Sequence, residues 1–356
     1  MIEIDFKEPT LETYDLMKTA IRTGDFKIFK QHLIDNMNIT LYKKMATIGL
    51  FKEVAKDIKK MQDGTNKVLK EINKDDNDDS ILELAEFYAK TFNMNQLKEE
   101  LFKLNETDSN TSLKMDIALC KIRMSIILED SEKLKQNIKK AEKLVEDGAN
   151  WDRRNRFKVY NGLYHLINKN YDQAEPLLYE SLASFEAEEL LSFDRVVMYL
   201  IYTSLLSYKR PLFYQNILIN GDVLKYREFL EFPMALYNCE YGSCFSSLKR
   251  FIDINKEDVF LSPIEDEFVD EMKILCYNQF LYSYQTVEIG RMAESFGITI
   301  EDLESDLRKF VFKNRLTIKI DRIDGIIHVD NIMSVSENND DTECEETLRY
   351  VRKQII

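Results

Sequence analysis

The sequence predicts a mostly helical protein in which a series of amphipathic helix pairs is followed by a winged helix. Two observations lead to this fold class. The chain of 356 residues has only 10 glycines and 5 prolines, which is too few turn-forming residues for a many-stranded β protein. Apolar residues also recur at helical spacing from about Leu11 to Gln279, and they alternate with period two only beyond that point.

The first clear helix pair lies between residues 82 and 104. Its apolar stripe is formed by Leu82, Ala85, Ala89 and Phe92, and leucines continue at helical spacing from Leu97 after a polar corner. A second pair follows, in which Ser131 is the expected N-cap and Gly148 the expected C′ residue. Helices of about 15 to 18 residues with short corners give a repeat of roughly 35 to 40 residues, the range of helix-pair solenoids.

Small residues indicate how closely the next two helices approach. Gly162, Tyr171 and Ala174 fall at spacings used in tetratricopeptide repeats, where small side chains let paired helices lie close together. The full consensus of that repeat is absent. The sequence therefore predicts a tetratricopeptide-like solenoid without strict repeats.

The pattern changes after Gln279. An apolar helical stripe ends at Gly297, and Thr299 with Asp302 forms a capping box that opens a second helix. Period-two alternation over 316–320 and a turn at Asp324-Gly325 then predict a two-stranded hairpin. Helix, turn, helix and hairpin together are typical of a winged helix, and this hairpin is the only β structure that we expect.

The chain after Asp330 is predicted to hold an acidic spacer and a short C-terminal helix. Leu348, Val351 and Ile355 provide the apolar face of that helix. The resulting domain boundaries are 1–148 for an N-terminal helical-repeat region, 149–279 for a second helical-repeat part, 280–333 for the winged helix and 334–356 for the spacer and terminal helix.

Known catalytic and cofactor motifs are missing from the sequence. None of the ten glycines belongs to a phosphate-binding loop, and there is no H-E-x-x-H, paired C-x-x-C or G-x-S-x-G motif. The three histidines, His32, His165 and His328, are far apart in sequence, so structural or surface roles are favoured. Cys239 and Cys244 are five residues apart without a second ligand pair, and we interpret them as small buried residues rather than zinc ligands. We expect no catalytic residue, cofactor or metal.

Charge argues against nucleic acid and membrane as partners. The formal net charge is −14, and the second helix of the winged helix carries carboxylates where base contacts are made in DNA-binding proteins. Four basic residues of the wing keep residual nucleic-acid contact open: Lys313, Arg315, Lys319 and Arg322. No window approaches about 20 apolar residues, and the five scattered cysteines and the first residues predict a reducing compartment.

The densest unusual motif is W-D-R-R-N-R, which starts at Trp151. In one interpretation it is a helix corner, with Trp151 packed and Asp152 favourable at the start of the next helix. In the other, Arg153, Arg154 and Arg156 pair with carboxylates of a partner protein, which guanidinium groups bind bidentately. Spacing alone favours the corner.

Three stretches resemble the PCI-domain lid subunits of the 26S proteasome regulatory particle: Leu144 to Leu178, Tyr284 to Val329, and Asn36 to Lys74. The resemblance implies a non-catalytic subunit whose PCI domain, a helical repeat ending in a winged helix, assembles side by side with others. It further implies as partners the other PCI lid subunits, the lid deubiquitinase module and the proteasomal ATPase ring, within a hetero-oligomer of cytoplasm and nucleus.

Three alternatives remain from the sequence. The first is the equivalent subunit of the signalosome, which removes a ubiquitin-like modifier from cullins, and the second is a nucleic-acid-associated PCI protein of mRNA export or translation initiation. An unrecognised enzyme is the third. The hypothetical protein interface consists of Trp151, Arg153, Arg154, Arg156, Leu316, Thr317, Ile318, Lys319, Ile320, Ile326, Ile327, Val329, Leu348, Val351 and Ile355.

Overall fold

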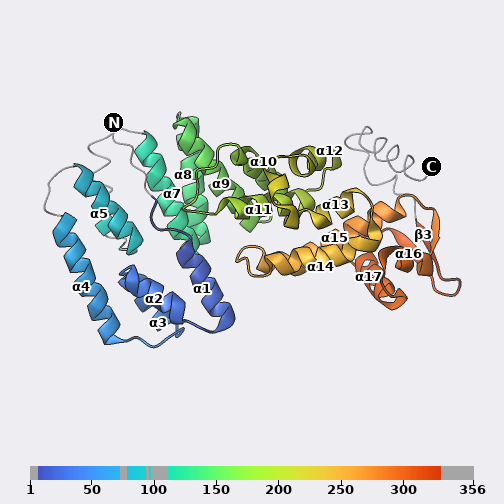
Figure 1. The fold of residues 1–356 in the computed structure, drawn as a ribbon, viewed down its shortest axis with the longest axis horizontal. Helices are drawn as coiled ribbons and strands as arrows, with labels where there is room; N and C mark the ends of the chain where they lie inside the picture. The colour runs from blue at the N-terminus through green and yellow to red at the C-terminus, as the bar shows by residue number, and fades with distance from the viewer. Residues whose placement is uncertain (1–6, 73–77, 94–95, 98–110, 330–356) are drawn as a thin grey trace. The chain divides into compact units, whose positions relative to one another are not determined.

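The computed structural model describes residues 7–72, 78–93, 96–97 and 111–329 (Figure 1). Two compact units divide the chain, one ending at Ser207 and the other beginning at Tyr208. Helices make up most of both units, which confirms the predicted fold class. The boundaries predicted at 148, 279 and 333 stay predictions.

The first unit is built from helices throughout its described part. Successive helices pack as neighbours, α7 on α8, α9 on α10 and α10 on α11. Their bounds are α1 Glu12–Thr23, α2 Lys27–Asp35, α3 Ile39–Thr47, α4 Ala55–Ile72, α5 Asp78–Lys90, α7 Thr111–Ile127, α8 Ser131–Glu146, α9 Trp151–Ile167, α10 Tyr171–Leu182 and α11 Phe193–Leu206.

The two ends of α8 are capped as the sequence predicts, with one correction at the N-terminal end. Gly148 has a φ of 92°, the left-handed conformation expected of a C′ glycine. The N-cap is Asp130 rather than Ser131, because the Asp130 carboxylate accepts a hydrogen bond from the Lys133 N–H at 3.0 Å. Ser131 is the first residue of the helix proper.

The close approach of α9 and α10 depends on Gly162. A Cβ atom at this position would lie 2.8 Å from Leu178 Cδ2, and Leu178 is itself fully buried in α10. Ala174, one turn earlier in α10, is also fully buried. The prediction that small residues set this helix spacing is confirmed.

A buried ion cluster lies between α7, α9 and the connection from α10 to α11. We use this name for Asp116, Arg123, Arg153, Arg156, Tyr160 and Glu189, all of them buried. Glu189 Oε1 accepts hydrogen bonds from Arg156 Nη2 at 2.8 Å and from the Tyr160 hydroxyl at 2.6 Å. Burial raises the pKa of Tyr160 well above its usual value, so the phenol keeps the proton that it donates.

The arginines of the cluster link α7 to α9. Arg153 Nε donates to Asp116 Oδ2 at 3.1 Å, and Arg153 Nη1 donates to Asp152 at 2.8 Å. Arg123, fully buried in α7, donates to the Tyr160 hydroxyl and has a nitrogen 3.6 Å from Glu189 Oε1. Buried charges are tolerated only when they are paired in this way.

The same cluster holds the N-terminal segment. Arg123 Nε donates to the Pro9 carbonyl at 2.9 Å, and Arg123 Nη2 donates to the Glu8 carbonyl at 3.0 Å. The Leu11 N–H donates to the Glu189 carbonyl at 3.1 Å. Residues that are more than 100 positions apart in sequence therefore meet at one buried arginine and one buried glutamate.

The second unit begins with short helices and ends in the winged helix. Its aromatic core is centred on Phe296, whose ring lies 5.0 to 5.4 Å from those of Tyr241, Phe245, Tyr277 and Phe280. The elements are α12 Arg210–Phe213, η1 Tyr214–Leu218, η2 Val223–Lys225, η3 Arg227–Phe229, α13 Glu231–Tyr237, α14 Tyr241–Asn255, η4 Ser262–Ile264, α15 Glu265–Leu281, β1 Thr286–Glu288, α16 Ile289–Phe296, α17 Ile300–Phe312, β2 Ile318–Asp321 and β3 Ile326–Val329.

The winged helix follows its predicted order with one addition. Gly297 ends α16 with a φ of 65°, and the Thr299 hydroxyl accepts the Asp302 N–H at 3.1 Å, as the predicted capping box requires. The predicted hairpin is present as β2 and β3, but the sheet has three strands in the order β1-β3-β2, so the expectation that the hairpin is the only β structure is wrong. Strand β1 was not predicted, because it is only three residues long and a single buried residue, Val287, gives no period-two alternation.

Gly162→Ala should lower the free energy of unfolding by about 1 to 3 kcal/mol, because the new methyl group must displace the buried Leu178 side chain. Urea denaturation followed by circular dichroism measures the change. Gly290→Ala is the control, since a Cβ there would meet only Ile300 Cδ1 at 3.9 Å and should be neutral or stabilising. Equal stability of both variants would contradict the close approach.

Glu189→Gln should lower the free energy of unfolding by about 3 to 5 kcal/mol, because it leaves the buried Arg123 and Arg156 without their shared carboxylate. The matched control is Glu188→Gln, at the exposed neighbouring position, which should change stability by less than about 0.5 kcal/mol. If the two variants unfold at the same urea concentration, the cluster does not stabilise the unit.

Candidate protein interface

The sheet of the winged helix leaves strand β2 at an edge. Strand β3 lies in the middle, paired on one side with β1 and on the other with β2. The main chain of β3, which includes the predicted interface residues Ile326, Ile327 and Val329, is therefore used within this chain. Among the described strands, only β1 and β2 have an open side, so the predicted interface residues of β3 offer no free main chain to a partner's strand.

The register shows which amide groups face outward from β2. The Val329 N–H donates to the Gln285 carbonyl beside β1, so the alternate amide of His328 points the other way, toward β2. His328 is paired with Lys319, whose N–H therefore points back toward β3. The N–H groups of Ile318 and Ile320 consequently point away from the sheet, at the free edge.

The side chains of the predicted wing residues divide into two groups. Leu316, Ile318 and Ile327 are buried in the core of the unit, so their side chains stabilise this chain rather than contact a partner. Thr317 and Lys319 are exposed, and Ile320, Ile326 and Val329 are half-buried. What the edge presents is thus main chain flanked by two polar side chains.

Basic residues of the wing are paired with acids of the same unit. Lys313 Nζ lies 3.1 Å from Asp270, and Arg315 holds both oxygens of Glu271 at 2.6 Å. Arg322 Nη2 lies 2.9 Å from Glu304. Burial favours a higher pKa for Asp270, but hydrogen bonds from two lysines outweigh it and the pKa is lowered, so the carboxylate stays charged.

The second helix of the winged helix, α17, keeps its acidic character. Its carboxylates Glu301 and Asp302 are exposed at the N-terminal end. Asp306 accepts hydrogen bonds from Lys273 at 2.7 Å and from the Tyr277 hydroxyl at 2.9 Å, which ties α17 to α15. Burial, and then the charge of Asp306, raises the pKa of Tyr277. Paired cations and exposed acids do not suit a phosphate backbone.

The W-D-R-R-N-R motif divides between two faces of α9. Arg153 and Arg156 are buried in the ion cluster of their own chain, so the prediction that they pair with a partner's carboxylates is wrong for them. Their carboxylate partners, Asp116 and Glu189, were missed because no local pattern connects residues 37 and 33 positions apart. Trp151 is 60% exposed rather than packed, and Arg154 is also exposed.

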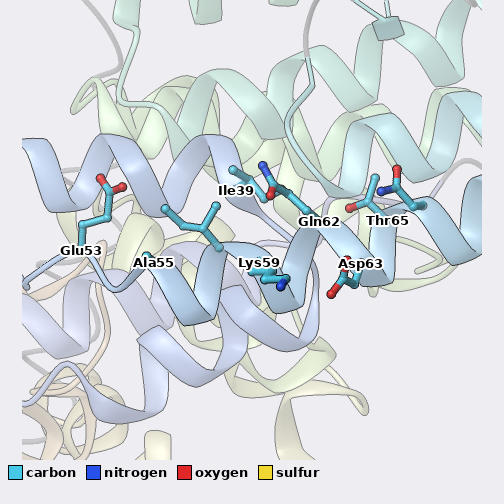
Figure 2. Close-up of a pocket in the computed structure, with 9 residues that line it drawn as sticks. Ile39, Glu53, Ala55, Lys59, Gln62, Asp63 and Thr65 are labelled. Carbon is cyan, nitrogen blue, oxygen red and sulfur yellow. The ribbon is translucent and has the colours of Figure 1, made fainter.

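A surface groove of about 600 Å³ runs along the N-terminal half of α4 (Figure 2). Glu53, Lys59 and Asp63 are its charged residues, and the described lining includes no histidine, cysteine or serine. The described residues also contain no group of three or more histidine, cysteine or acidic side chains placed to hold a metal. None of the described helices combines the length and apolar character that a membrane span requires.

The remaining candidates from the sequence lie in separate places. Cys244 is buried with its sulfur 3.4 Å from that of Cys276, as expected of small core residues, whereas Cys239 is half-buried. His32 is hydrogen-bonded to Thr13 at 3.0 Å in α1. The predicted tail residues, Leu348, Val351 and Ile355, lie outside the described residues.

Two family models match the chain. The model described as 26S proteasome subunit RPN7 matches residues 47–216, and the model of the PCI domain matches residues 253–331. The second match contains the winged helix with all three strands of its sheet.

Curated relatives agree with these matches. A 26S proteasome non-ATPase regulatory subunit 6 of Dictyostelium discoideum is 34% identical over 70% of this chain, and the match spans 66% of that relative, just under two thirds. A 26S proteasome regulatory subunit rpn7 of Schizosaccharomyces pombe is 28% identical over 88% of this chain and 82% of its own. COP9 signalosome complex subunit 1 of Caenorhabditis elegans is 23% identical, over 47% of this chain and 29% of its own. Most of the chain is therefore similar to the family of 26S proteasome subunit RPN7, and residues 253–331 match the PCI domain.

Proposed function

We propose that this chain is a non-catalytic scaffold subunit of the 26S proteasome lid, which assembles through its PCI domain and supports ubiquitin-dependent protein degradation. Its partners are the other PCI lid subunits, the lid deubiquitinase module and the proteasomal ATPase ring. It acts as part of a hetero-oligomer in cytoplasm and nucleus. The similarity to the RPN7 and PCI family models supports this role, and the free edge of β2 is the structural observation that carries it.

The edge of β2 has the chemistry for joining a partner's sheet. Two outward N–H groups, of Ile318 and Ile320, lie on a strand whose other side is fully paired with β3. An additional strand would satisfy these donors through main-chain hydrogen bonds, and exposed Thr317 and Lys319 would flank it. Assembly through main chain suits a family of related subunits, because it depends on strand geometry rather than on a particular side chain.

The alternatives have less support. The signalosome relative is less similar and matches under a third of its own length, whereas the proteasome relatives match more than half of theirs. A nucleic-acid role would need free basic residues beside α17, yet Lys313, Arg315 and Arg322 are paired with Asp270, Glu271 and Glu304. The proteasome lid is therefore the preferred assembly.

Calorimetric titration of the purified chain with ATP should give no heat of stoichiometric binding. The sequence contains no phosphate-binding loop, and the relatives' names describe non-ATPase regulatory subunits. A titration with Mg²⁺-ATP, with a known ATPase as positive control, checks this expectation. Saturable binding with one nucleotide per chain would contradict a purely structural role.

Ile320→Pro should weaken incorporation into the lid by about tenfold, because it removes one outward donor and places a ring against the incoming strand. Helical circular dichroism should not change. Native gels of the lid reconstituted from co-expressed subunits measure incorporation.

Two controls accompany this variant. Ile320→Val keeps the outward N–H and should assemble normally. Lys319→Pro should instead destabilise the winged helix itself, because the N–H of Lys319 faces β3. If Ile320→Pro and Ile320→Val assemble equally well, β2 does not join a shared sheet.

A further inference from the structure

A second groove, separate from the winged helix, lies in the first unit between α8, α9 and α10. Its volume is about 550 Å³, within the range of ligand-binding pockets. Helix α8 contributes two acidic residues, α9 contributes Trp151 and two basic residues, and α10 contributes one leucine. The lining residues are Glu142, Val145, Glu146, Trp151, Arg154, Asn155, Phe157, Lys158, Asn161 and Leu177.

Helical periodicity explains why α9 supplies both a buried ion cluster and this groove. Trp151, Arg154, Lys158 and Asn161 follow one another at spacings of three, four and three residues, so they form one stripe along the helix. Arg153 and Arg156 lie on another face and point into the core. The one arginine of the motif that the ion cluster does not use therefore faces the groove.

Apolar surface lies open in this groove. The Trp151 side chain is 60% exposed, beside half-buried Val145 and Leu177 and buried Phe157. An exposed indole next to an apolar floor is the arrangement that contributes most to binding energy at protein interfaces. A partner's apolar side chain of ordinary size would fit on this floor against the ring.

Charges on the two walls orient the occupant. Arg154 is exposed and has no ion pair within the described residues, whereas Lys158 lies 3.0 Å from Glu180. Glu142 and Glu146 line the opposite wall. A carboxylate of a molecule bound in the groove is therefore favoured on the α9 side, next to Arg154, and disfavoured on the α8 side, next to the two glutamates.

Two polar atoms of the lining lack hydrogen-bond partners. Asn155 and Asn161 are more than nine-tenths buried, and among the described residues neither Asn155 Nδ2, a donor, nor Asn161 Oδ1, an acceptor, has a hydrogen-bond partner. Buried polar groups of this kind destabilise a protein when they are left without a hydrogen-bond partner. A peptide group brings both a carbonyl acceptor and an N–H donor. An extended main chain offers these groups, whereas a helix uses them internally.

We propose that this groove binds an extended segment of another polypeptide, with an apolar side chain against Trp151 and an adjacent carboxylate on Arg154. The site is independent of the β2 edge and adds a second contact to the proposed scaffold. It assigns to the exposed half of the W-D-R-R-N-R motif the partner-binding role that its buried half does not have.

Trp151 is the chain's single tryptophan, so its fluorescence reports on this groove without a label. The full-length chain is titrated with the peptide acetyl-Ser-Asp-Leu-Ser-amide. We expect a saturable blue shift of the emission as the indole is covered, with a Kd on the order of 1 mM or lower. Replacing Asp by Lys, or Leu by Gly, in the peptide should weaken binding by about tenfold or more.

Protein variants test the same contacts from the other side. Arg154→Glu should weaken binding of the Asp-Leu peptide by about tenfold or more, whereas Arg227→Glu, the same charge change at an exposed position in η3, should leave it unchanged. Ile320→Pro should bind the peptide normally even where lid assembly fails, which separates this site from the β2 edge. The proposal is overturned if the Asp-Leu peptide gives no saturable shift up to about 10 mM, or if it binds Arg154→Glu as well as the unmodified chain.

Discussion

The shared carboxylate of Glu189 is the interaction on which the first unit depends. It stands before α11, yet it holds Arg156 and Tyr160 of α9 directly and lies 3.6 Å from Arg123 of α7. Each buried arginine alone would carry a large desolvation cost, and the arrangement is favourable only because carboxylates and carbonyls surround them together. Since Arg123 also binds the Glu8 and Pro9 carbonyls, the path of the N-terminal segment is set by the same charges.

Helix α9 shows how one short motif performs two tasks. Its arginines alternate between the core and the surface because a helix turns by 3.6 residues, and the pairs Arg153/Arg156 and Trp151/Arg154 are each three residues apart. The buried pair fixes the helix against α7, and this rigid support holds the exposed pair in place beside the α8 wall. A surface contact supported in this way loses little conformational entropy when a partner binds.

Local features of this fold could be predicted from the sequence, and long-range pairings could not. The apolar stripes, the glycine ends at Gly148 and Gly297 and the Thr299 capping box follow from contacts within a few residues, so they are visible in the pattern. The role of Gly162 could be predicted because a small residue at the spacing found in tetratricopeptide repeats lets two paired helices lie close together. The partners of the motif's arginines and the pairing of β1 with β3 join residues more than 30 positions apart, and no periodicity records such pairs. The interface itself stays a prediction, and burial, which the sequence pattern did not give, decides which of its described residues face outward.

The ion pairs of the second unit explain why the groups available for binding at the β2 edge of the wing are main-chain groups and not basic side chains. Asp270 and Glu271, on consecutive positions of α15, pair with Lys313 and Arg315, so two of the wing's cations serve to dock it on its own helix. Arg322 is likewise paired with Glu304 of α17. With these side chains engaged, the outward N–H groups of β2 are the donors at this edge that the described sheet leaves unpaired. An unpaired strand edge tends to bind another strand regardless of sequence, and exposed Thr317 and Lys319 limit which strands can approach. The ion pairs therefore have two consequences. They occupy the basic side chains that would bind phosphate, and they leave the main chain of β2 as the group at this edge that is open to a partner's strand.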